Sequence, residues 1–341
     1  MRKRVWLKVL LLCVGISFLA AGAVVKQREG KKEKAVSRKT ERIREEYQKQ
    51  DGEEPQGVLT LNGTKYEYFH EYETYLFLGT DASGAEEKEG DAYRGSMADF
   101  LMVAIIDKTS HTYAVLQLNR DIMTEVTLMQ RDGSGMASAS LQLCTAHWYG
   151  GTKEQSCENT VKAVSNLLGD VPIAGYYALN MEQIPIVNHA VGGVEVTVEN
   201  DFSKVDSSLR KGETLTLSDE QAYTFVHDRY GVDDETNLGR MERQRQYLSG
   251  LFAKLQESSR ENPDFCIKMY QMLEDESVTD MTGKEVSKLA REISRSTGKG
   301  IYTLKGTSET GKTLGDGIEH TEFYVEEDSL IEVLTELYGL R

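Results

Sequence analysis

The sequence has few of the signatures that identify an enzyme class directly. It contains four cysteines in 341 residues, and it has no glycine-rich phosphate-binding loop, no dinucleotide-binding glycine motif and no internal repeat. These absences argue against a nucleotide hydrolase with a phosphate-binding loop, a dinucleotide-dependent oxidoreductase and a repeat array. A hydrophobic content of 39% is nevertheless enough for a sizeable core, in one large domain or two.

The main part of the chain has far fewer basic than acidic residues. The whole sequence carries 40 Lys and Arg against 55 Asp and Glu, a net charge of −15. Residues 1–57 hold 14 of the basic and 8 of the acidic residues, which leaves 26 against 47 in residues 58–341, a net charge of −21. Such an acidic body repels nucleic acid, so no nucleic-acid partner is expected.

A long hydrophobic run lies at the N-terminus. Residues 5–25 are interrupted only by Lys8 and are long enough for one transmembrane helix if Lys8 reaches the lipid headgroups. Basic residues lie on both sides of the run, so charge hardly determines its orientation. The short basic head favours an uncleaved signal-anchor: a single-pass protein of the cell membrane whose C-terminal domain is extracytoplasmic. A signal peptide cleaved near Ala21-Gly22-Ala23 is the alternative.

The composition divides the chain into three parts. Residues 1–25 form the cytoplasmic head and transmembrane segment, and residues 26–57 are dense in charge and typical of a stalk. Residues 58–341 form the predicted extracytoplasmic domain. Its cysteines Cys144 and Cys157 flank a short loop. They form either a disulfide, with Cα atoms about 4.4–6.8 Å apart, or two buried free thiols.

Hydrophobic patterning predicts an α/β fold. Asn62-Gly63 between two alternating runs predicts a hairpin. Strands with near-continuous apolar residues are typical of a sheet buried on both faces, and they are expected at residues 75–78, 100–106 and 113–118. Helices are expected at residues 158–168, 218–226, 240–255 and 329–340, the second beginning with a capping box at Ser218.

Charged residues stand at the ends of the three predicted strands. Asp81 follows the first strand, Asp99 precedes the second, and Arg120 and Asp121 follow the third. Ligands collect at strand ends in layered α/β domains, so these side chains are expected to meet. Two carboxylates suit Mg²⁺, which predicts Asp81 and Asp99 as metal ligands. Taken singly, each aspartate is better explained as a turn residue or a helix cap.

A cluster of donors opens the helix predicted at residues 240–255. Arg240, Arg243 and Gln244 have i, i+3, i+4 spacing, which places them on one helix face. Forked guanidinium groups and an amide near a helix start are suited to a multiply charged oxyanion such as pyrophosphate. The spacing alone also fits a solvated helix face.

The order of these segments resembles the LytR-CpsA-Psr family of membrane-anchored cell-wall glycopolymer ligases. The likeness covers roughly residues 75–255, with residues 256–341 as a C-terminal extension. The matching segments, in chain order, are Gly79-Thr80-Asp81, Ala98-Asp99, Asn119-Arg120-Asp121, Tyr149-Gly150-Gly151, residues 164–169, residues 190–194, residues 219–222, Arg229-Tyr230 and Gly239-Arg240 with Arg243-Gln244.

The resemblance implies a fold, a reaction and a site. The fold would be an α/β/α sandwich with a central mixed sheet behind one transmembrane helix. The reaction would be Mg²⁺-dependent transfer of a glycopolymer from a polyprenyl-pyrophosphate carrier to a peptidoglycan hydroxyl at the outer face of the membrane. Asp81, Asp99 and Arg120 would be catalytic, with Asp81 and Asp99 holding the metal and Asp81 also a candidate base. Pyrophosphate would be bound by Arg120, Arg229, Arg240, Arg243, Gln244 and His227.

Some positions depart from the family pattern. Met97 and His227 stand where the family usually has arginine, Cys144 ends a segment that has lost its polar groups, and Asn237 replaces an aspartate. The lost arginines weaken the grip on phosphate. They leave two alternatives open: a polyprenyl-pyrophosphate hydrolase, and a non-catalytic sensor of lipid-linked glycan that regulates envelope biogenesis. A head of eight residues is too short to bind DNA directly.

Overall fold

The structure is a computed structural model that describes residues 54–81, 96–129, 135–262, 265–282 and 296–341, together with residues 285, 288, 289, 292 and 293. The predicted transmembrane segment and most of the predicted stalk lie outside the described residues. Within the described part of the chain, no helix has both the length and the apolar character that crossing a membrane requires.

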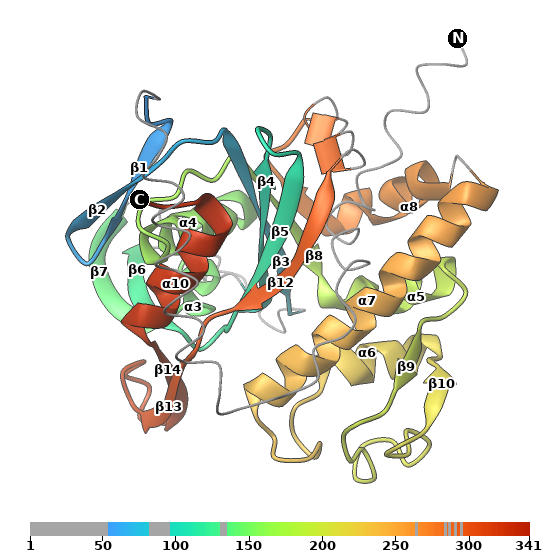
Figure 1. Cartoon of the computed structure of the whole chain (residues 1–341). Coiled ribbons are helices and arrows are strands. Elements are labelled where there is room, and N and C mark those ends of the chain that lie inside the picture. Colours follow the sequence, from blue (N-terminus) through green and yellow to red (C-terminus); the bar gives the residue numbers. More distant parts are fainter. Residues whose placement is uncertain are drawn as a thin grey trace, which may run out of the picture.

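A six-stranded mixed sheet forms the centre of the fold (Figure 1). Its strands, in spatial order, are β11 (Ser277–Thr279), β8 (Gly175–Asn180), β3 (Tyr72–Thr80), β4 (Ala98–Asp107), β5 (Thr112–Leu118) and β12 (Thr297–Thr303). β4 pairs antiparallel with both β3 and β5, whereas β8 and β12 run parallel to their neighbours β3 and β5. The predicted strands at residues 75–78, 100–106 and 113–118 are the cores of β3, β4 and β5.

Both faces of the sheet are buried, as the near-continuous apolar strands predict. Along β4, Leu101, Val103 and Ile105 join one hydrophobic cluster, while Met102 and Ala104 join another on the opposite face. Side chains alternate between faces along a strand, so a strand with no wet face must be apolar throughout.

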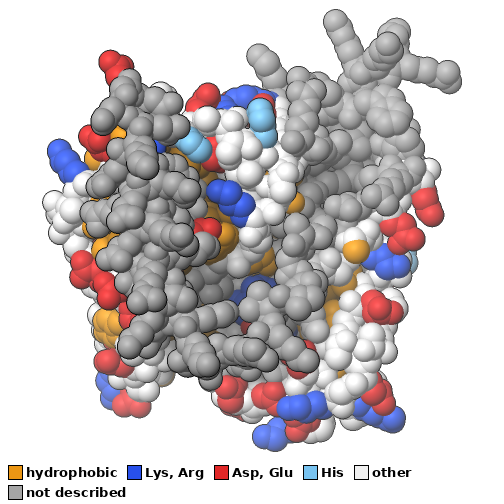
Figure 2. Space-filling model, in the orientation of Figure 1, with side chains coloured by type: hydrophobic (Ala, Val, Ile, Leu, Met, Phe, Trp, Pro, Cys, Tyr) orange, Lys and Arg blue, Asp and Glu red, His pale blue; other side chains and the backbone are white. Residues whose placement is uncertain are grey.

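Helices flank the sheet on both sides (Figure 1). One side carries α3 (Thr145–Trp148), α4 (Lys153–Leu167), α10 (Glu327–Tyr338) and the hairpin of β6 (Met123–Met129) and β7 (Gly135–Gln142). The other carries α5 (Ile184–Ala190), α6 (Asp219–His227), α7 (Asn237–Glu261) and α8 (Phe265–Leu273), with the small ladder of β9 (Glu195–Thr197) and β10 (Thr214–Thr216). The face seen in Figure 2 has acidic side chains along its edges, in keeping with the acidic composition of the body.

Local signals explain where several elements begin and turn. Asn62 and Gly63 have φ values of 48° and 78° between β1 (Gly57–Leu61) and β2 (Thr64–Tyr68), which confirms the predicted tight hairpin. The Ser218 capping box is present at α6. The helix expected from residue 240 begins three residues earlier, because the Thr236 hydroxyl accepts a hydrogen bond from the Gly239 amide at 3.1 Å.

The last third of the chain is part of the same fold. It supplies β11, β12 and α10, and Leu334 and Leu337 of α10 belong to the main core cluster. The hairpin of β13 (Gly306–Gly311) and β14 (His320–Val325) reaches the turn after β5, because the Phe323 amide donates to the Asp121 carbonyl at 2.8 Å. Residues from this hairpin therefore lie beside residues from the middle of the chain.

No disulfide joins Cys144 and Cys157, which are both buried free thiols. The Cys144 sulfur accepts from Arg120 Nη2 at 3.1 Å, and the Cys157 sulfur lies 3.8 Å from His147 Nε2. Burial raises the pKa of the Cys157 thiol to about 12. Of the two alternatives that the sequence left open, the structure has the free thiols.

We expect Gly250→Ala to destabilise the protein, although alanine favours a helix over glycine by about 1 kcal/mol. A Cβ at Gly250 would lie 2.6 Å from Val194 Cγ1 and 3.0 Å from the Glu195 carbonyl, so α7 would have to move away from β9. Overpacking of this kind costs on the order of 1–3 kcal/mol. Thermal unfolding measures the loss. The exposed neighbour Ser249, changed to alanine, is the control and should keep or slightly raise the melting temperature; a more stable Gly250→Ala would contradict the contact.

Candidate functional site

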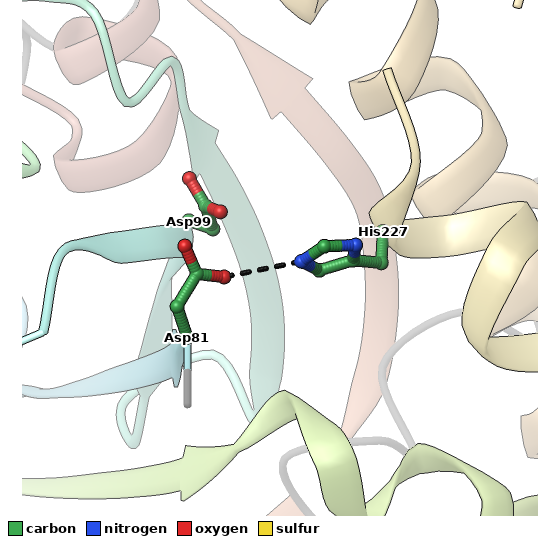
Figure 3. A group of neighbouring side chains, drawn as sticks. All are labelled: Asp81, Asp99 and His227. Carbon is green, nitrogen blue, oxygen red and sulfur yellow. Dashed lines mark hydrogen bonds and ion pairs between the residues drawn. The ribbon is translucent and has the colours of Figure 1, made fainter. Parts of the chain in front are cut away.

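The ends of β3 and β4 bring Asp81 and Asp99 together (Figure 3). The two strands are antiparallel and pair up to Thr80 and Ala98, and the Asp81 amide donates to the Met97 carbonyl at 3.3 Å. A residue just after one strand therefore faces a residue at the start of the next, as the sequence predicts for these two aspartates. Burial and the neighbouring Asp99 carboxyl raise the pKa of Asp81.

Asp99 is clamped between two arginines. Its side chain is buried, Arg120 Nη1 contacts its Oδ1, and Arg240 Nη2 donates to the same oxygen at 3.2 Å. Burial alone would raise the pKa of Asp99, but the charges of Arg120 and Arg240 outweigh it and hold the pKa at about 2. The structure thus joins three of the predicted site residues from the sheet and α7.

Arg240 is fixed by more than its ion pair. Its Nη2 donates to Asn237 Oδ1 at 2.9 Å, and Asn237 Nδ2 donates to Asn119 Oδ1 at 2.7 Å. The same Asn119 oxygen accepts from the Asp121 amide at 2.9 Å. Asn237, which departs from the family pattern, is therefore part of the bond network that orients Arg240. Sequence reasoning missed Asn119, although it belongs to the turn that carries Arg120.

His227 completes the group at the end of α6. Its Nε2 lies 3.3 Å from Asp81 Oδ1 (Figure 3), and its Nδ1 lies 3.0 Å from Asp228 Oδ1. The Tyr223 ring stacks on the imidazole at 4.5 Å. The bonds to Asp228 and Asp81 raise the pKa of His227 to about 9. Tyr223 and Asp228 were not among the predicted residues; Tyr223 precedes His227 by one helical turn and Asp228 is its neighbour in sequence.

Asp81, Asp99 and His227 offer a donor set for a divalent cation. One ligand atom from each of the three lies within 4.8 Å of the others. Two carboxylates suit Mg²⁺ and Mn²⁺, and an added imidazole favours Mn²⁺ over Mg²⁺. The hydrogen bond that Nδ1 donates to Asp228 orients the ring so that Nε2 faces the carboxylates, an arrangement common behind metal-bound histidines. The sequence predicted His227 as a phosphate ligand; the structure adds that its Nε2 is close enough to the two carboxylates to be a third ligand of a cation.

Arg243 and Gln244 do not join this group, contrary to the prediction that they bind pyrophosphate with Arg240. Both are 3% exposed. Arg243 Nε donates to the Phe225 carbonyl at 2.8 Å and Nη2 to the Asp228 carbonyl, while Gln244 Nε2 donates to the Val226 carbonyl at 3.1 Å. The last turn of a helix leaves carbonyls without partners, and these two side chains satisfy them at the end of α6. They hold His227 in place rather than facing a ligand.

A cavity of about 300 Å³ is lined by Arg120, the partner of Asp99, and by Arg229. Arg229 is partly exposed; its Nη2 donates to the Tyr230 hydroxyl at 2.6 Å. Met97, which replaces a family arginine, also lines the cavity, and its sulfur accepts from Arg120 Nη2 at 2.9 Å. Arg229 is thus the predicted guanidinium best placed to meet a ligand from solvent.

Asp99→Asn and Asp81→Asn should change stability in opposite directions. The folded pKa of Asp99 lies below its unfolded value, so its ionised form contributes stability above about pH 4 that is lost as the pH falls toward 2. Removing this charge leaves the buried Arg240 and the partly buried Arg120 without this carboxylate, at a cost of roughly 3–5 kcal/mol. The folded pKa of Asp81 is raised, so its ionised form costs stability at neutral pH and asparagine removes that cost.

Urea unfolding at pH 7 in EDTA, repeated at lower pH, measures both effects. The difference in free energy of unfolding between the parent and Asp99→Asn should shrink as the pH falls below about 4, because the parent then loses the same charge. Equal stability of Asp99→Asn and the parent at pH 7 would contradict the ion-pair assignment.

Comparisons with known proteins agree with this architecture. Residues 31–338 match the LytR_cpsA_psr family. A Bacillus cereus protein named polyisoprenyl-teichoic acid–peptidoglycan teichoic acid transferase TagU is 31% identical over 171 residues, 50% of each chain. A protein of the same name from Enterococcus faecalis is 27% identical over 263 residues, 77% of each chain. The crystal structure of Bacillus subtilis TagV is similar with a TM-score of 0.57 and 22% identity, covering 79% of this chain and 97% of that one.

The match to the Bacillus cereus relative thus spans about half the length of each protein, whereas the family match takes in nearly all of the described residues. It includes the strand ends that carry Asp81 and Asp99, the Arg120 turn, and the α6–α7 segment that carries His227 and Arg240. The chain belongs to the LytR_cpsA_psr family.

Proposed function

We propose that this protein transfers a glycopolymer from a polyprenyl-pyrophosphate carrier to a hydroxyl group of peptidoglycan at the outer face of the cell membrane. The observation that carries the proposal is the meeting of a possible metal site, Asp81, Asp99 and His227, with the guanidinium groups of Arg120 and Arg240. Transfer of a phosphoryl group needs this combination of cations, because negative charge must be stabilised on the group that leaves. The relatives named as teichoic acid–peptidoglycan transferases support the same reaction class.

In the proposed reaction, an acceptor hydroxyl forms a new bond to the phosphorus that bears the glycan. The bond from that phosphorus to the bridging oxygen breaks, and polyprenyl phosphate leaves. A divalent cation, Mg²⁺ or Mn²⁺, would stabilise charge on the pyrophosphate when held by Asp81, Asp99 and His227. Arg229 and Arg120 bind phosphate oxygens, and Arg240 keeps Asp99 ionised and oriented. Asp81, whose pKa is raised, is the candidate acceptor of the hydroxyl proton.

The proposed location follows from the N-terminal sequence. Residues 5–25 would anchor the protein as a single transmembrane helix, and residues 26–57 would hold the folded body beyond the lipid surface. A substrate with a prenyl tail stays in the membrane, so an anchored enzyme meets it by diffusion in two dimensions. The acidic body gives no support to a nucleic-acid partner.

The test uses the full-length protein in detergent with a polyprenyl-pyrophosphate glycan, peptidoglycan fragments and Mg²⁺, and mass spectrometry of the products. Glycan joined to peptidoglycan supports transfer. Free glycan phosphate alone would indicate a hydrolase, and bound lipid without any release would indicate a sensor. Arg229→Ala should raise the KM for the lipid substrate about tenfold or more, since a charge-assisted bond contributes about 1.5–3 kcal/mol.

Arg210→Ala is the matched control for Arg229→Ala. Arg210 is an exposed arginine whose partner in the structure is Glu213 at 3.7 Å, so its removal should leave the KM unchanged. Both variants should have the same melting temperature as the parent. A KM for Arg229→Ala equal to that of Arg210→Ala would remove Arg229 from the substrate site.

The metal assignment predicts that His227→Gln weakens Mn²⁺ binding by tenfold or more, measured by electron paramagnetic resonance of free Mn²⁺ without any substrate. His189→Gln is the matched control, because His189 also lies 3.0 Å from an aspartate, Asp219, but on an exposed part of the surface. Unchanged Mn²⁺ affinity in His227→Gln would return this histidine to a role in phosphate binding.

A further inference from the structure

We infer that Tyr230 is a positioning residue for the substrate phosphate: its ring and its hydroxyl group hold the guanidinium of Arg229 in place beside the cavity. The inference rests on the proposed function, in which Arg229 binds a phosphate oxygen. The two residues are neighbours in the loop between α6 and α7, and both line the cavity of about 300 Å³. Tyr230 thus acts on the substrate through Arg229 rather than by touching it.

Two contacts join the guanidinium to the tyrosine side chain. Arg229 Nη2 donates a hydrogen bond to the Tyr230 hydroxyl at 2.6 Å. Arg229 Cζ lies 4.7 Å from the centroid of the Tyr230 ring, within the distance of a cation–π contact. An arginine side chain has many rotamers, so two contacts to one rigid ring restrict both the position and the tilt of its guanidinium.

Arg229 differs from the two other arginines of the site in having no carboxylate partner. Arg120 and Arg240 each form an ion pair with Asp99, whereas Arg229 forms none with the carboxylates of the described residues. A phenol hydroxyl accepts a hydrogen bond without carrying a charge. Tyr230 therefore fixes the guanidinium and leaves its positive charge available to a phosphate oxygen.

Carboxylates near Arg229 have other partners. Those of Asp121, Glu235 and Glu319 line the same cavity. Their contacts, in that order, are with Arg120 Nε at 3.8 Å, the Gly231 amide at 3.0 Å and Lys312 Nζ at 3.6 Å. A carboxylate bound to Arg229 would compete with phosphate for the guanidinium, and the phenol of Tyr230 gives it a partner that carries no such charge.

The exposure of Tyr230 favours a role in binding over a role in folding. Its side chain is 72% exposed, so it buries little apolar surface and contributes little to the core. A guanidinium that is already oriented loses less conformational freedom when a ligand binds. We therefore expect loss of the Tyr230 side chain to weaken phosphate binding and to leave the melting temperature unchanged.

The test is a double-mutant cycle measured by isothermal titration calorimetry of inorganic pyrophosphate into the full-length protein, in detergent with Mg²⁺. Tyr230→Ala should weaken binding about fivefold, and Tyr230→Phe, which keeps the ring and loses the hydroxyl, about twofold. In the Arg229→Ala background, Tyr230→Ala should change the affinity by less than about twofold, because the guanidinium that it positions is gone. Tyr324→Ala, at an exposed tyrosine outside the cavity, is the control.

The cycle separates this inference from the proposed function. Equal weakening by Tyr230→Ala in both backgrounds would show that the tyrosine meets the ligand itself. That result, or an unchanged affinity of Tyr230→Ala, would overturn the inference and leave the phosphate role of Arg229 intact. Pyrophosphate binding that is absent in the parent, or that Arg229→Ala does not weaken, would reject that role and the inference with it.

The transfer assay gives a second readout, because a change in positioning and a loss of folded protein affect different constants. Tyr230→Ala should raise the KM for the lipid substrate and leave kcat unchanged. A partly unfolded variant would instead have a lower apparent kcat with the KM of the parent, and that outcome would contradict the positioning role.

Discussion

The buried ion pair of Asp99 with Arg120 and Arg240 is the interaction on which the site depends. It joins the start of β4, the turn after β5 and the first turn of α7. Burial of a carboxylate is costly unless cations compensate it, and two guanidinium groups do so here. The charge of Asp99 is thereby fixed before any ligand arrives, which is the condition for a preorganised electrostatic site.

A second set of bonds determines where the imidazole of His227 lies. Arg243 and Gln244 on α7 satisfy the last carbonyls of α6, and the imidazole Nδ1 donates to Asp228 Oδ1. The end of α6, which carries His227, is therefore bonded to α7, the helix that also supplies Arg240. Arg240, which pairs with Asp99, and the two side chains that bond to the end of α6 therefore all come from one helix, α7.

Arg120 lies between the charged group and the cavity. Its Nη1 contacts Asp99, and on that side Arg240 and the possible metal ligands Asp81 and His227 are close by. On its other side Arg120 lines the cavity together with Met97, Cys144 and Arg229. One side chain thus borders both the charged group and the open space beside it.

The sequence alone determined the fold class, the three central strands, the hairpin at Asn62-Gly63 and the capping box of α6, because hydrophobic period and turn chemistry are local. It also predicted that Asp81, Asp99, Arg120 and Arg240 belong to one site, since charged residues at strand ends and helix starts converge in layered folds. The boundaries of α7 were less well predicted because a single hydroxyl at Thr236 sets its start.

Only the tertiary structure decided how the remaining polar residues are used. Helical spacing placed Arg240, Arg243 and Gln244 on one face, but it carried no information about the carbonyls at the end of α6 that occupy two of them. The possible role of His227 as a metal ligand is visible only in the structure, because its neighbour across the site is a carboxylate 146 residues away in sequence. The cavity wall formed by Asp121, Gln142 and the β13–β14 hairpin is equally non-local, since it exists only once distant segments pack together.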